Sequence, residues 1–81
     1  MQLMLDNLPP EVTEEALTEL LSGLGVPAPA EMVIAAGTRN RPSAVISLDV
    51  DHATMEALVK LLDGRYWMGH VMHASHTSLF E

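Results

Sequence analysis

The order of two apolar periodicities along the chain constrains its fold more than any other sequence feature. Short apolar runs over residues 2–6, 31–36, 43–50 and 70–75 are typical of β-strands, and the third run alternates clearly between apolar and polar residues. Two stretches between these runs repeat large apolar residues at helical spacing instead. The chain is therefore expected to run strand, helix, strand, strand, helix, strand.

Both helical stretches carry start and stop signals. The first is expected over residues 14–23, with Thr13 as its N-cap and Gly25 just beyond its end. The second is expected to start after Asp51 and to end near Gly64, where a C-terminal glycine cap would lie. Their apolar stripes are Leu17, Leu20, Leu21 and Leu24 in the first helix and Met55, Leu58, Val59 and Leu62 in the second.

This order of elements predicts an α+β fold, the ferredoxin-like βαββαβ sandwich. Two helices would cover one face of a four-stranded antiparallel sheet, and the other face would be open to solvent. Because the chain has 81 residues, we expect one domain over residues 1–81 with a modest core. The open sheet face is the expected place for function.

The absence of cysteine excludes disulfides, thiolate catalysis and cysteine zinc sites. The sequence contains neither a pattern typical of a signal peptide nor an apolar run near the roughly 20 residues that span a bilayer. We therefore expect a cytoplasmic protein, or a nuclear one in a eukaryote, that is neither secreted nor bound to a membrane.

The charge balance disfavours polyanions as partners. Four Lys and Arg residues stand against eleven Asp and Glu residues, which gives a formal net charge of −7. Since basic groups supply most of the affinity of proteins for nucleic acids, a small domain of this charge is repelled by them on average.

Several local motifs point to one family. Residues 3–8 read LMLDNL and are followed by Pro9, residues 12–25 read VTEEALTELLSGLG, and residues 62–70 read LDGRYWMGH. With the order of elements, these motifs make the chain resemble the RNA-recognition motif (RRM) family along nearly its whole length. The resemblance implies the same sandwich fold, with residues 41–48 (RPSAVISL) as the family's third-strand motif and the open sheet face as a surface for single-stranded RNA.

The open sheet face departs from the family pattern. The family places aromatic side chains at three positions that Met4, Ser43 and Val45 occupy here. Base–aromatic stacking contributes about 1–3 kcal/mol per base. Loss of two stacking platforms would therefore weaken RNA binding by roughly 30- to 10⁴-fold.

The candidate site residues follow from this resemblance and from the alternation of strand side chains. On the sheet face they are Met4, Asp6, Ser43, Val45, Ser47, His73 and Ser75. Val33 and Ala35 are expected to extend an aliphatic patch around Met4 and Val45. A basic loop of Arg39, Asn40 and Arg41 adds a possible contact to phosphates.

The histidines near the C-terminal end suggest a metal cluster only at first sight. On one strand, His70 and His76 would share a face while His73 would lie on the other, so the three could not meet one ion. We therefore expect no metal site and no cofactor. His52 is expected at the start of a helix, without a role.

No motif for nucleophilic or phosphate chemistry occurs, so we expect neither an enzyme nor a small-molecule substrate. Two binding functions stay open. An aliphatic, acidic open face favours a protein partner or self-association. The alternative is weak or noncanonical binding of single-stranded RNA through the sheet face and the loop of Arg39 to Arg41.

Overall fold

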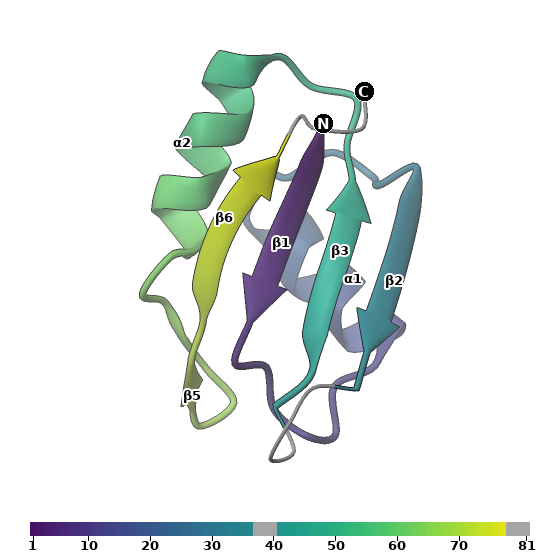
Figure 1. Cartoon of the computed structure of the whole chain (residues 1–81), viewed down its shortest axis with the longest axis vertical. Coiled ribbons are helices and arrows are strands. Elements are labelled where there is room, and N and C mark those ends of the chain that lie inside the picture. Colours follow the sequence, from purple (N-terminus) through teal and green to yellow (C-terminus); the bar gives the residue numbers. More distant parts are fainter. Residues whose placement is uncertain (37–40, 78–81) are drawn as a thin grey trace.

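The sheet of the fold is four-stranded and antiparallel, with strand order β2-β3-β1-β6 (Figure 1). The computed structural model describes residues 1–36 and 41–77. The strands of the sheet are β1 (Gln2–Asp6), β2 (Glu31–Ala35), β3 (Ser43–Ser47) and β6 (His73–Thr77), and the helices are α1 (Glu14–Gly23) and α2 (His52–Leu62). The α+β sandwich and the bounds of both helices agree with the sequence prediction.

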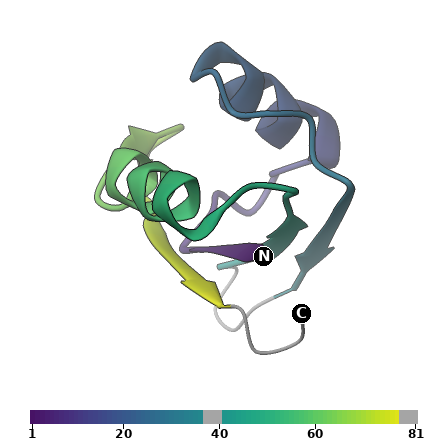
Figure 2. The same cartoon turned by 90° about the horizontal axis from the view of Figure 1, so that it is seen from above.

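Both helices lie on the same side of the sheet, which leaves the opposite face uncovered (Figure 2). Each helix begins at a side-chain cap: Thr13 Oγ1 accepts the backbone N–H of Ala16 at 3.1 Å, and Asp51 Oδ1 accepts that of Thr54 at 2.7 Å. These bonds satisfy backbone donors that a helix cannot pair internally. In the described part of the chain, no helix has the length and apolar character needed to cross a membrane.

The core lies between the sheet and the two helices. The residues that β1 and β3 point inward are fully buried, while the residues between them on each strand are only partly buried. The buried cluster consists of Leu3, Leu5, Leu8, Leu17, Leu21, Val26, Ala44, Ile46, Leu48, Met55, Leu58, Leu62 and Met72. The inward-facing residues of the strands and the apolar stripes of the helices thus form one apolar layer.

The fourth strand of the sheet starts three residues later than the sequence suggested and runs on to Thr77. Residues 70–75 were expected to form it, but His70–Val71 is a separate strand, β5, that pairs with β4 (Tyr66–Trp67) in a small hairpin. Met68 and Gly69 connect the two with φ of 49° and 87°, as a two-residue type I′ turn requires. The sheet strand β6 starts only at His73, after the fully buried Met72.

A glycine-containing loop and an apolar contact end α1. Gly25 has φ of 82°, and the next residue, Val26, donates its N–H to the carbonyl of Leu21 at 2.9 Å. Val26 is itself buried, so this end is a Schellman-type cap with its usual apolar contact.

Truncation of Leu5 is expected to lower the free energy of unfolding by about 2–5 kcal/mol, because the side chain is fully buried and leaves a cavity. The neighbouring Met4 lies on the other face and is only partly buried, so Met4→Ala is expected to cost about 1 kcal/mol or less. Urea denaturation of Leu5→Ala and Met4→Ala would check this. Equal losses would mean that β1 does not present its faces as described.

The N-cap of α2 predicts a pH dependence. Hydrogen bonds from the side chain and the backbone N–H of Thr54 hold the pKa of Asp51 below its usual value. A depressed folded-state pKa stabilises the fold above the unfolded pKa of about 3.9, and this contribution is lost as pH falls through the lower folded value. Asp51→Ala is therefore expected to lower the melting temperature at neutral pH but not once the carboxylate is protonated.

Melting curves of the wild type and Asp51→Ala across this acid range would measure the effect. Asp49→Ala removes another exposed carboxylate that lies outside the helix and serves as the matched control. A gap between wild type and Asp51→Ala that stays constant down to the lowest pH would contradict the cap assignment.

Candidate binding surface

The uncovered sheet face presents its side chains in three rows that run across the strands. Because the pairing registers of β1 with β3 and β6, and of β2 with β3, are fixed by the backbone, each row takes one residue from each strand. The rows are Glu31, Ser47, Gln2 and Thr77; Val33, Val45, Met4 and Ser75; and Ala35, Ser43, Asp6 and His73. All seven residues that the sequence analysis placed on this face lie in these rows.

The middle row is aliphatic over three of its four positions. Val33 is opposite Val45, which is opposite Met4, and Ser75 completes the row on β6. Val33 is 51% exposed, and Val45 and Met4 are half-buried among their neighbours. Since alternate residues of each strand point inward to the core, this row forms a continuous aliphatic ridge on the solvent side. We refer to Val33, Val45 and Met4 as the aliphatic ridge.

The row at the end of β1 is polar. The Ser43 hydroxyl donates to Asp6 Oδ1 at 2.7 Å, which ties β3 to β1 beyond their last paired residues. His73 is the register partner of Asp6 on β6 and is exposed. Its Nδ1 lies 3.9 Å from Asp63 Oδ1, an exposed pair that contributes little to stability.

The exit of β1 is fixed by the residue after Asp6. Asn7 has φ of 61°, a conformation that asparagine tolerates better than most residues, and its side-chain amide donates to the carbonyl of Val71 at 2.8 Å. The next residue, Leu8, donates its N–H to the carbonyl of Pro42. Through these two hydrogen bonds, the residues after β1 connect one end of the open sheet face to the β4–β5 hairpin and to the residue before β3.

Only part of the predicted basic loop can be placed. Arg39 and Asn40 lie outside the described residues, and Arg41 is exposed two residues before β3 begins. The three rows themselves carry two carboxylates, those of Asp6 and Glu31, and no lysine or arginine. Among the described residues, the open face is thus aliphatic in its centre and acidic rather than basic around it.

Aromatic side chains are missing from these rows, apart from the imidazole of His73. Tyr66 and Trp67 form β4 in the hairpin, where Tyr66 is 71% exposed and Trp67 packs against the core. At the three positions where the RRM resemblance leads one to expect rings, the structure places Met4, Ser43 and Val45 on the open face.

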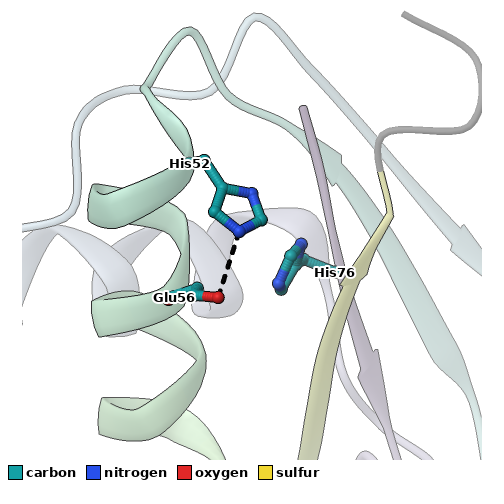
Figure 3. A group of neighbouring side chains, drawn as sticks. All are labelled: His52, Glu56 and His76. Atoms are coloured by element: carbon teal, nitrogen blue, oxygen red, sulfur yellow. Dashed lines mark hydrogen bonds and ion pairs between the residues drawn. The ribbon is translucent and has the colours of Figure 1, made fainter.

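One side-chain cluster was missed by the sequence analysis. His52 and Glu56, on α2, lie beside His76 of β6 on the helix side of the sheet (Figure 3). The separation of His76 from His73 onto opposite faces agrees with the expected alternation. The sequence signal for this cluster is the spacing of His52 and Glu56, since residues four apart on a helix share one face.

Comparisons with known proteins agree with this architecture. The family model of the RNA recognition motif matches residues 3–73. No curated protein sequence matches the chain significantly.

Three solved structures illustrate the similarity in fold. The RRM3 domain of Pes4 has a TM-score of 0.79 at 16% identity, covering 99% of this chain and 94% of that one. The Rna15 RRM with bound RNA (GU) has a TM-score of 0.76 at 19% identity, covering 99% and 85%. The Mip6 RRM3 domain has a TM-score of 0.75 at 19% identity, covering 91% and 88%. With the family model matching most of its length, the chain belongs to the RNA recognition motif family.

Proposed function

We propose that the chain is a non-catalytic binding module whose open sheet face docks a protein segment that presents an aliphatic side chain between basic residues. The observation that carries this proposal is the aliphatic ridge of Val33, Val45 and Met4, in which Met4 and Val45 occupy positions where RRM domains commonly place rings. Contiguous apolar patches on the surface of a small domain are typical of interaction sites.

The shape and chemistry of the ridge favour an aliphatic contact over a nucleobase. Methionine and valine side chains have no π-face on which a base could stack, whereas they pack well against other aliphatic groups. The neighbouring serines, Ser43, Ser47 and Ser75, add small polar groups that do not hinder a close approach. The centre of the face is therefore suited to an apolar anchor.

The acidic charge around the ridge favours a partner that has basic residues beside its apolar anchor. Asp6 and Glu31 lie in the rows on either side, and the chain as a whole carries a formal charge of −7. A partner with Lys or Arg beside its apolar anchor would gain from this field, which steers association and selects among partners. A second copy of the chain would bring the same acidic groups, so self-association through this face is the weaker version of the proposal.

Single-stranded RNA is the second candidate ligand. Membership of the RRM family and the fold similarity to the RNA-bound Rna15 domain favour it. His73 could stack on or hydrogen-bond a base, and the hydroxyls of Ser43, Ser47 and Ser75 offer further hydrogen bonds. The acidic field and the missing rings limit the affinity expected for this ligand.

A charge placed on the ridge is expected to weaken peptide binding. Short synthetic peptides with one Leu or Ile between Lys or Arg residues are the probe, and binding is measured by fluorescence anisotropy. Val45→Asp is expected to weaken the best peptide by at least about tenfold, because it buries a carboxylate against the apolar anchor.

Leu61→Asp is the matched control, since Leu61 is an apolar residue, 41% exposed, on α2 rather than on the sheet face. Equal loss in Val45→Asp and Leu61→Asp, or no binding of any such peptide by the wild type, would refute the protein proposal.

Rings restored on the ridge are expected to strengthen RNA binding. Met4 and Val45 are register partners on adjacent strands, so the double variant Met4→Phe, Val45→Phe would create two neighbouring stacking platforms. Pooled short single-stranded RNAs are expected to bind this variant at least about 30-fold more tightly than the wild type, with affinity falling as salt rises.

Tight, salt-sensitive RNA binding already present in the wild type, and unchanged by the added rings, would favour RNA as the ligand through contacts other than stacking. The corresponding Met4→Leu, Val45→Ile variant enlarges or reshapes the ridge without adding π-faces and serves as the control.

A further inference from the structure

We propose that His52, Glu56 and His76 form a binding site for a divalent metal ion of the zinc type. The site lies on the helix side of the sheet, between α2 and β6, and so is separate from the open face that carries the proposed binding function (Figure 3). It does not depend on that proposal, and each can fail without the other.

The three side chains are brought together by both elements of secondary structure. His52 and Glu56 are four residues apart on α2, so they lie one above the other on the same face of the helix. His76 is the register partner of the buried Leu3, so it lies on the inner side of β6, toward α2. Figure 3 shows its ring directed into the space beside the other two side chains.

The distances between the potential ligand atoms are close to those of a metal site. His52 Nε2 lies 3.0 Å from Glu56 Oε1, and one ligand atom from each of the three residues lies within 4.8 Å of the others. Ligands about 2.0–2.1 Å from a tetrahedral zinc ion lie roughly 3.3 Å apart. The side chains of His52 and Glu56 are 65% and 55% accessible, so they have room to rotate toward His76.

A buried ring nitrogen of His76 supplies a second, independent observation. Its Nδ1 is buried and has no hydrogen-bond partner among the described residues. The rings of His52 and His76 meet edge to face, with centroids 5.2 Å apart and an interplanar angle of 77°. A buried imidazole nitrogen without a hydrogen-bond partner calls for an explanation, and histidine is the commonest metal ligand in proteins.

Some of the charges around the site favour a bound cation and others oppose it. Glu56 and the N-cap carboxylate of Asp51 attract a cation, while the N-terminus of α2 opposes one. Lys60 lines the same open cavity of about 310 Å³ as Glu56 and His76. Its ammonium would repel a metal ion, but Lys60 is exposed and its side chain can extend into solvent. The cavity is open to solvent beside two of the three ligands, Glu56 and His76.

The ligand set selects the class of ion. Two imidazoles and one carboxylate suit Zn²⁺, Ni²⁺ or Cu²⁺, whereas Ca²⁺ and Mg²⁺ require more oxygen ligands. Three protein ligands leave one tetrahedral position for water or for a donor from another molecule. A bound ion would also connect α2 to β6.

Titration of the 81-residue chain with ZnCl₂ tests the site. One Zn²⁺ per chain is expected to bind by calorimetry, and the side-chain resonances of His52 and His76 are expected to shift while those of His70 and His73 do not. Zinc is also expected to raise the melting temperature, since it binds only the folded arrangement. MgCl₂ at the same concentration is expected to do neither.

Variants of the exposed ligands keep the test independent of folding. His52→Ala and Glu56→Gln change exposed side chains and are each expected to weaken zinc binding by at least about tenfold. His73→Ala removes a histidine three residues from His76 on the opposite face and is the matched control. Absence of zinc binding to the wild type, binding that survives in His52→Ala, or binding that is lost in His73→Ala would overturn the proposal.

Discussion

The pairing of β1 with β3 on one side and β6 on the other is the constraint on which the rest of the structure depends. Leu3 and Leu5 are fully buried and anchor the register of the central strand, because a slip by one residue would expose both and bury Met4 and Asp6. The register in turn decides which residues of the neighbouring strands share a row. The aliphatic ridge on one face and the position of His76 on the other are both consequences of it.

The two faces of the sheet therefore offer different chemistry. On the open face, the family's fold is kept but the side chains that stack bases are replaced by aliphatic and small polar groups. On the helix face, the packing of α2 against β6 brings two imidazoles and a carboxylate together at the rim of the core. The proposed binding face and the proposed metal site can coexist in one small domain because the sheet separates them.

Most of the fold could be predicted from the sequence because its signals are local. The caps at Thr13 and Asp51, the helical stripes and the alternation in β3 each depend on residues within a few positions of one another. The break before β6 could not be predicted in the same way. It depends on the Met68–Gly69 turn and on Asn7, which lies 64 residues from the Val71 carbonyl that it binds.

The two candidate sites differ in the same way: local sequence patterns predict one of them but not the other. Met4, Val45 and Ser43 could be placed on the open face because strand alternation and the family motif both specify it. The cluster of His52, Glu56 and His76 requires knowledge of how a helix packs on an edge strand, which no local pattern contains. Strand alternation correctly separated His73 from His76, but it could not indicate that His76 would meet a second histidine across the helix–sheet interface.

The central claim is that the aliphatic ridge is the contact surface of this RRM domain. Backbone amide NMR spectra of the isotope-labelled chain, recorded while the best basic and aliphatic peptide is added, test it most directly. The account predicts that the amides of Val33, Val45, Met4 and their row neighbours shift, with the helices largely unchanged. Shifts confined to α1 and α2, with a silent sheet face, would contradict it.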